Sequence, residues 1–143
     1  MNSNYTKPTK AGDITREWHE KNAEGEVLGR LATDVAKLLI GKSKPNFARN
    51  LDMGDYVVVT NAAKIVVTGS KAEQKLYDNY SGYPGGLKQV KFKDLNESKP
   101  GEVIRLAVSG MLPKNKLRKQ RIARLYIFAG ADHKYKDKFE DKQ

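Results

Sequence analysis

Two nearly continuous apolar runs, residues 56–60 and 64–68, constrain the fold of this chain more than any other feature. Both runs are rich in valine and isoleucine, and neither alternates apolar with polar residues. Such runs are typical of strands that are buried on both faces, as in a sheet covered by helices. The sequence therefore predicts two strands of a layered α/β domain.

Two other segments have the periodicity of helices that would cover such a sheet. Residues 28–40 place apolar side chains on one face at spacings of three and four, with Arg30, Asp34 and Lys37 opposite. A second helix is predicted to begin at Pro100 and to end before Pro113. The two apolar stripes comprise Leu28, Leu31, Ala32, Val35, Leu38 and Leu39 in the first helix and Val103, Ile104, Ala107, Val108 and Met111 in the second.

The remaining segments are shorter and less regular. The pattern predicts a short strand around Trp18, a short helix over 70–78, a turn-rich loop over 79–88, a short basic helix over 115–124 and a last strand over 125–130. Residues 1–13 are polar and read as a flexible arm. The residues after His133 read as a charged tail.

Positive charge dominates the chain. There are 27 Lys+Arg against 17 Asp+Glu, a formal net charge of +10, which favours a polyanionic partner. From Val103 to Ala131 there is no acidic residue, and six cations fall within 114–124. Such cations repel one another unless an anion is present, so nucleic acid binding is the preferred interpretation and an ordinary basic face the alternative. The cations of the acid-free stretch are Arg105, Lys114, Lys116, Arg118, Lys119, Arg121 and Arg124.

The loop 79–88 supports the same interpretation. Tyr80 and Tyr83 can stack on unpaired bases, and Lys75 and Lys88 flank them in sequence. The alternative is that the tyrosines are half-buried packing residues. Because the chain lacks the sequence signatures of common base-reading modules, we expect recognition of the shape and phosphates of folded RNA.

The run Gly41-Lys42-Ser43 resembles the end of a phosphate-binding P-loop. That motif needs another glycine five residues earlier, where this chain has Ala36, and a helix after the loop instead of before it. We therefore predict that Gly41 ends the preceding helix as a C-cap. Lys42, Lys44 and Arg49 would then form a basic loop that can touch phosphates.

Other chemical sites are not indicated. His19 and His133 are far apart in sequence, and the absence of cysteine excludes disulfides and thiolate zinc sites. Asp52 and Asp55 could serve as a carboxylate pair, although flanking the start of a strand is the preferred interpretation. We expect no enzymatic activity, no cofactor and no small-molecule substrate. The N-terminus lacks the apolar core of a secretory signal, and no segment is apolar enough to span a membrane.

Four stretches resemble the bacterial-type large-subunit ribosomal protein L13 family: "GEVLGRLATDVAKLLIGKSKP", "GDYVVVTNAAKIVVTGSKAEQKLY", "SGYPGGLK" and "AVSGMLPKNKL". They occur in the family's order within roughly residues 18–133. The resemblance implies a single three-layer α/β domain over 14–133, with a mostly parallel sheet flanked by helices, basic loops, and flexible termini at 1–13 and 134–143. It implies a structural role on large-subunit ribosomal RNA, early in subunit assembly, beside neighbouring large-subunit ribosomal proteins in the cytoplasm, with an organelle matrix as the other possible location.

The resemblance also implies RNA contacts at ten positions, and His133 matches a histidine of the family. Those positions are Lys42, Lys44, Arg49, Lys71, Tyr80, Ser81, Tyr83, Lys114, Asn115 and Lys116. The basic clusters add Lys75, Lys88, Arg118, Lys119 and Arg121 as candidate RNA contacts. A nucleotide hydrolase, a free regulatory RNA-binding protein and an anionic-membrane binder are the rival interpretations.

The chain departs from the family pattern at several positions. His19, Glu20 and Lys21 stand where the first strand is usually apolar, so that strand is expected to be shorter, shifted or more exposed. Arg118 replaces a usual glycine, which favours a longer basic helix. Lys134 and Tyr135 replace a usual Pro-His, which removes the basis for carrying over contacts of the family's tail.

Overall fold

The computed structural model describes residues 7–140, and its centre is a parallel sheet of three strands. The strands are β1 (Trp18–Asn22), β2 (Tyr56–Thr60) and β5 (Leu125–Ile127), in the order β1-β2-β5. The middle strand β2 is buried from Val57 to Thr60, as its continuous apolar sequence predicts. The edge strand β1 pairs with β2 along its whole length, from Trp18 opposite Tyr56 to Asn22 opposite Thr60. Its polar residues are tolerated because the edge is only half-buried.

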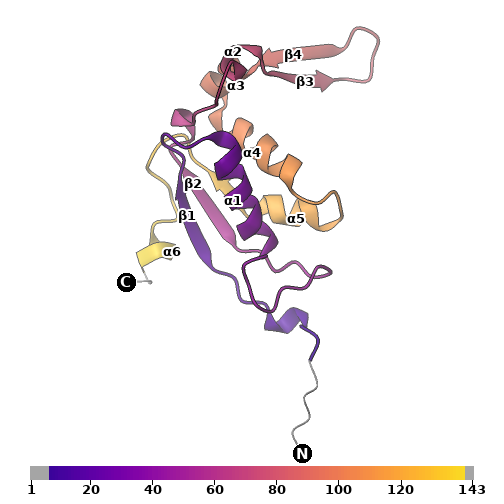
Figure 1. Ribbon diagram of the computed structural model, residues 1–143, viewed down its shortest axis with the longest axis vertical. Coiled ribbons are helices and arrows are strands. Elements are labelled where there is room, and N and C mark those ends of the chain that lie inside the picture. The colour runs from indigo at the N-terminus through magenta and orange to yellow at the C-terminus, as the bar shows by residue number, and fades with distance from the viewer. Residues whose placement is uncertain (1–6, 141–143) are drawn as a thin grey trace, which may run out of the picture.

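One face of the sheet is covered by α1 (Leu28–Ile40), α4 (Pro100–Met111) and α5 (Leu117–Ala123) (Figure 1). The apolar stripe of α1 is buried as predicted, with Leu38 half-buried at its edge. In α4 the stripe is correct except at Met111, which is 43% exposed. The helix ends there, and Leu112 adopts an extended conformation that takes it into the core instead.

The opposite face of the sheet is covered by the C-terminal segment, which includes α6 (Asp137–Glu140). Trp18 stacks on Tyr56, with 4.5 Å between ring centroids, and Tyr135 lies 5.1 Å from Trp18 and 4.6 Å from Tyr126. Phe139 meets Trp18 edge-on at 6.4 Å. The expected tail therefore contributes a third layer as far as it is described, and residues 141–143 of that prediction lie outside the described residues. The three-layer α/β fold with a parallel sheet flanked by helices is confirmed.

The second predicted strand, 64–68, is wrong. Asn61 adopts a left-handed conformation (φ 56°), and the chain leaves the sheet through the short 3₁₀ helix η2 (Ala62–Lys64). The amides of Asn61 and Ala62 donate to Gly130 and Phe128, which fixes this change of direction. The apolar run does not add a strand to the sheet. Instead, Ile65 is buried in the core, and Val66 forms an isolated parallel bridge with Val27 at the start of α1.

The predicted helix 70–78 and loop 79–88 are also corrected. Only α2 (Lys71–Gln74) is helical, and the chain then forms an antiparallel hairpin of β3 (Leu76–Tyr80) and β4 (Leu87–Lys91). Gly82 and Gly85 take positive φ values of 87° and 71° in the turn, which explains the glycines there. An additional helix that sequence reasoning missed, α3 (Phe92–Ser98), follows and buries Phe92. The hairpin projects from the body of the molecule (Figure 1).

The N-terminal segment runs along the loop that follows α1. Residues 1–6 of the predicted flexible arm lie outside the described residues. The short 3₁₀ helix η1 (Ala11–Asp13) precedes β1, and the hydroxyl of Thr9 donates to the carbonyl of Asn46 at 3.0 Å. Among the helices that the structure describes, none is long and apolar enough to cross a membrane.

Candidate nucleic-acid interface

The Gly-Lys-Ser run lies at the carboxyl end of α1. Gly41 has φ 79°, and its amide donates to the carbonyls of Lys37 and Leu38 at 3.0 and 3.1 Å. A Cβ at Gly41 would come 2.5 Å from the Met53 carbonyl, so both the conformation and the close approach require glycine. The predicted C-cap is confirmed. Lys42 and Ser43 therefore follow a helix instead of opening one, unlike the residues of a P-loop.

Asp52 holds a buried group of arginines that the sequence did not reveal. Both carboxylate oxygens accept hydrogen bonds from the guanidinium of Arg124, and Arg121 Nε lies 3.7 Å from Oδ1. Arg16 adds a longer contact at 3.8 Å. The counter-charge for Arg121 and Arg124 thus comes from Asp52, which is 72 positions away from Arg124 in the sequence.

Arg121, which is predicted to contact RNA, lies mostly inside the protein and also lines a cavity with Lys42 and Arg49, and its RNA contact stays a prediction. Its side chain is 2% exposed and is directed from α5 into the protein instead of facing solvent. Burial lowers the pKa of Arg121, the Asp52 carboxylate opposes that shift, and the neighbouring Arg124 charge adds to it. Arg121 is therefore an interior cation in this structure.

Asp55 holds a second internal cation, Lys44. The Lys44 ammonium donates to Asp55 Oδ1 at 2.5 Å and to the carbonyls of Thr15 and Met53 at 2.6 and 2.9 Å. An ammonium has three protons, so all of its donors are used within the protein. An RNA contact at Lys44 would require this ion pair to open, and it stays a prediction.

The Asp55 carboxylate is itself saturated with donors. Burial alone would raise its pKa, but the hydrogen bonds from Lys44, from the Glu17 amide (3.0 Å) and from His19 (3.1 Å) together lower the pKa of Asp55 below its usual value. The two aspartates do flank the start of β2, as the preferred interpretation held, and they also fix the loop before it. The sequence signal that could have indicated their buried ion pairs is the position of two carboxylates directly before a strand that is buried on both faces.

His133 is likewise part of the packing. Its side chain is 2% exposed, its Nε2 lies 3.3 Å from Glu20 Oε1, and its Nδ1 accepts the Tyr135 amide at 3.2 Å. Its ring lies 5.6 Å from that of Phe128 and 5.8 Å from that of Phe139. The C-terminal layer covers the His133 ring in this structure, and its RNA contact stays a prediction.

Six of the predicted cations lie exposed or half-buried where the loop after α1 meets α5. Lys42 and Arg49 line one side of a cavity of about 370 Å³, and Pro113 and Asn115 line the other. Arg118 is half-buried and donates to the Ser109 hydroxyl at 2.5 Å. We call this surface the α5 patch, and it comprises Lys42, Arg49, Lys114, Asn115, Lys116, Arg118 and Lys119. Within residues 7–140, none of its six cations is paired with a carboxylate.

A second group of predicted residues lies at and beside the hairpin. Tyr80 is 63% exposed and Tyr83 is 75% exposed, so the alternative that they are half-buried packing residues is wrong. Lys71, Lys75, Ser81 and Lys88 are also exposed. Lys71 and Lys75 of this group line a cavity at the start of α1, whereas the α5 patch adjoins its end. The 13 residues of α1 have a length of about 20 Å.

The family can now be decided from the match to known proteins. A family model described as ribosomal protein L13 matches residues 16–134, which include the sheet, the helical layer, the hairpin and the α5 patch. The chain belongs to the ribosomal protein L13 family.

Curated relatives of this L13 family member agree over nearly its whole length. It is 50% identical over 142 residues to the large ribosomal subunit protein uL13 of Caldanaerobacter subterraneus subsp. tengcongensis, covering 99% of this chain and 97% of the relative. It is 54% identical over 124 residues to uL13 of Clostridioides difficile, covering 87% of each chain. It is 53% identical over 128 residues to uL13 of Dehalococcoides mccartyi, covering 90% of each.

Proposed function

We propose that this L13 family member is a structural constituent of the large ribosomal subunit and binds large-subunit ribosomal RNA. The observation that supports this most directly is the α5 patch. Lys42 and Arg49 line one cavity with Asn115, Arg118 and Lys119 line a second cavity with the same Asn115, and Lys114 and Lys116 flank Asn115 in sequence. None of these six cations has a carboxylate partner in residues 7–140. Such cations are stabilised by phosphates, and each phosphate contact releases a condensed counterion. Six contacts correspond to a log–log salt slope of about −4 to −5 for single-stranded or duplex nucleic acid.

The fold supports a division of labour on that RNA. The α5 patch would hold phosphates, because lysine, arginine and amide side chains are the usual donors to phosphate oxygens. The buried ion pairs of Asp52 and Asp55 lie below the patch and fix its loops. The hairpin would hold unpaired bases, because Tyr80 and Tyr83 expose their rings beside Lys88. The role is one of binding and positioning instead of catalysis, and the partners are ribosomal RNA and neighbouring ribosomal proteins on the cytoplasmic large subunit.

Sedimentation of a cell lysate through a sucrose gradient tests the proposal. The chain is detected by antibody in each fraction, with gradients run in moderate and in high salt. Co-migration with large subunits that survives the salt wash is expected for a constituent held by many RNA contacts. Recovery in the light fractions alone at both salts would refute the ribosomal role and would favour an RNA-binding function outside the ribosome.

A further inference from the structure

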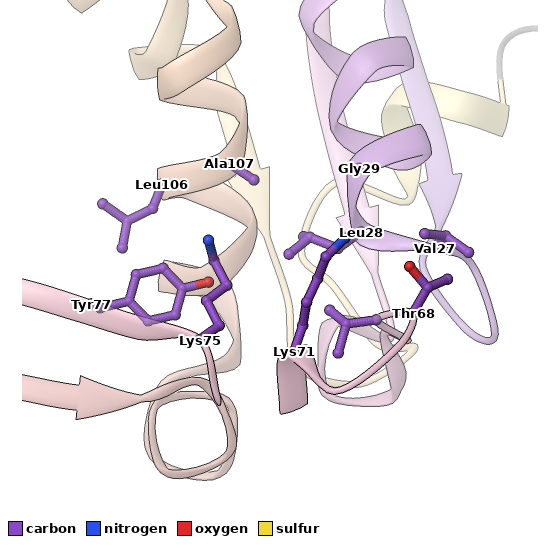
Figure 2. A pocket seen from close by; sticks show the side chains of 10 residues that line it. Val27, Leu28, Gly29, Thr68, Lys71, Lys75, Tyr77, Leu106 and Ala107 are labelled. Atoms are coloured by element: carbon purple, nitrogen blue, oxygen red, sulfur yellow. The ribbon is translucent and has the colours of Figure 1, made fainter. Parts of the chain in front are cut away.

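A further cavity lies apart from the α5 patch, at the start of α1. It measures about 420 Å³ and lies where α1, the segment 67–77 and α4 meet (Figure 2). Val27 and Leu28 line it from α1, and Leu106 and Ala107 line it from α4. Leu106 is 46% exposed, so this wall meets solvent in the free protein. We call this cavity the α1–α4 cleft.

Two lysines add positive charge to these apolar walls. In Figure 2 the ammonium end of Lys71 lies beside Leu28 at the start of α1, and that of Lys75 lies beside Tyr77 on the side of α4. The Lys75 ammonium lies 5.3 Å from the centroid of the Tyr77 ring, which also lines the cleft. No acidic side chain lines it, and neither lysine has a carboxylate partner in residues 7–140. The first turn of α1 adds the positive end of its helix dipole and carries no acidic residue.

This combination identifies the chemistry of an occupant. A bare phosphate would leave the apolar walls in contact with water, and an apolar side chain would bury two ammonium groups without a counter-charge. An RNA duplex is too wide for a cavity of this size, whereas small ligands fill cavities of roughly 300–1,000 Å³. An unpaired nucleotide has both parts that are needed, a flat base for the apolar walls and the Tyr77 ring, and a phosphate for the lysines.

We propose that the α1–α4 cleft binds one unpaired nucleotide that is turned out of the bound RNA. The base lies between the start of α1 and the Leu106–Ala107 wall of α4, and its phosphate lies against Lys71 and Lys75. Recognition of this kind is common for RNA, because its loops and bulges present unstacked bases. This proposal rests on the proposed function, since it names a binding mode within the same RNA complex.

Gly29 provides a variant that fills the cleft without straining the fold. Gly29 lines the cleft within α1, and a Cβ built on it meets no atom within 4 Å. In Gly29→Leu the added side chain occupies the space of the base. Gly29→Ala is the matched control, because it makes the same backbone change but adds only a methyl group. Thermal unfolding of both variants checks that the fold is kept.

The experiment measures binding of the full chain to a large-subunit ribosomal RNA transcript over a series of salt concentrations. We expect Gly29→Leu to weaken binding by about 5- to 150-fold, the range of one lost base contact, with an unchanged salt slope. Gly29→Ala should bind as the wild type does. A double Lys71→Gln, Lys75→Gln variant should flatten the salt slope by about 0.7–0.9, because it removes the one phosphate contact.

Chemical probing of the same complexes locates the nucleotide. We expect one unpaired nucleotide to be protected by the wild type and by Gly29→Ala, and to become reactive with Gly29→Leu. Leu106→Glu is a second variant that places a negative charge in the cleft, and Met111→Glu on the same helix is its control, since Met111 is 43% exposed and does not line the cleft. Leu106→Glu should weaken binding more than Met111→Glu.

The outcomes separate this proposal from the proposed function. If the wild type binds the transcript but the cleft variants bind it equally well with the same protections, the nucleotide site is refuted and RNA binding stands. If the cleft variants bind RNA normally yet fail to join large subunits, the cleft holds a neighbouring protein, which also refutes the nucleotide. If the wild type does not bind the transcript, both proposals fail.

Discussion

Cations that are neighbours in sequence have opposite environments in this molecule. Lys44, Arg121 and Arg124 lie below the surface on the carboxylates of Asp52 and Asp55. Lys42 and Lys119, each two residues from one of them, face solvent on the α5 patch. The comparison teaches that the excess of positive charge has two uses. The buried set fixes the loops, and the exposed set remains available for an anion.

The two sets should therefore respond differently to substitution. Removing one member of a buried ion pair leaves its partner charged in a poorly solvated site, which is costly. Removing an exposed cation leaves no unpaired buried charge, so it affects only the binding of an anion at that position. Stability and the salt dependence of RNA binding are thus two separate measurements, one for each set.

The largest effect is expected from Asp52→Asn. This change leaves Arg121 and Arg124, whose side chains are 2% and 9% exposed, without their shared carboxylate. We expect the free energy of unfolding to fall by about 3–5 kcal/mol, measured by urea denaturation at pH 7. Asp34→Asn is the control, because Asp34 is 56% exposed and its pair with Lys37 is worth at most about 1 kcal/mol. Equal losses in the two variants would show that the arginines do not depend on Asp52.

The second prediction concerns the pH dependence of the Asp55 site. Asp55→Asn should lower the free energy of unfolding at pH 7 by about 1–3 kcal/mol, since it weakens hydrogen bonds to a charged acceptor. The pKa of Asp55 is lowered in the folded state, so its stabilisation is present above the unfolded value near about 3.9 and is lost as pH falls through the folded value. The difference between wild type and variant should therefore shrink below about pH 4. A difference that stays constant from pH 7 to pH 3 would contradict this.

The third prediction tests the exposed set. A triple variant with Lys114, Lys116 and Lys119 replaced by Gln should flatten the log–log salt slope for a ribosomal RNA transcript by about 2–3. Its free energy of unfolding should stay within about 0.5 kcal/mol of the wild type, because the three side chains are exposed. Arg121 is left unchanged because it is buried.

The control for the triple variant replaces Lys134, Lys136 and Lys138 with Gln, which removes the same charge from the C-terminal layer. That variant should keep the wild-type slope. If both triple variants flatten the slope equally, net charge alone sets the RNA affinity, and the α5 patch has no special part in it.

The fold could be predicted where local pattern and environment agree. The apolar stripe of α1 and the cap at Gly41 depend on residues within a few positions of one another, and both are confirmed. The run 64–68 shows the opposite case. Its composition favours a strand, but the left-handed Asn61 and its bonds to the end of β5 turn the chain away. Those bonds join distant segments, and no local pattern reports them.

The sequence predicted which segments of the candidate site are basic, but it did not predict which of their cations are exposed. Composition located the basic segments, because charge without counter-charge is visible in the sequence. It could not tell which cations are exposed, because Arg124 meets Asp52 across 72 residues and Lys44 meets Asp55 across 11. Residues 76–80 do not alternate apolar with polar side chains, so the strand β3 is not predicted, although the glycines of the hairpin turn are visible in the sequence.

The smallest effect on RNA binding is expected from single substitutions in the loop after α1, at Lys42 and Lys44. Lys42→Gln should flatten the salt slope by about 0.7–0.9, the value for one phosphate contact, and leave the free energy of unfolding unchanged. Lys44→Gln removes the same charge two residues away, but its ammonium is bound to Asp55, Thr15 and Met53. It should lower stability in urea denaturation and leave the slope at the wild-type value. If Lys44→Gln flattens the slope as much as Lys42→Gln does, the Lys44–Asp55 pair opens when RNA binds. The two sets of cations would then differ only in the free protein. In the complex, a buried cation would leave its carboxylate and contact the RNA.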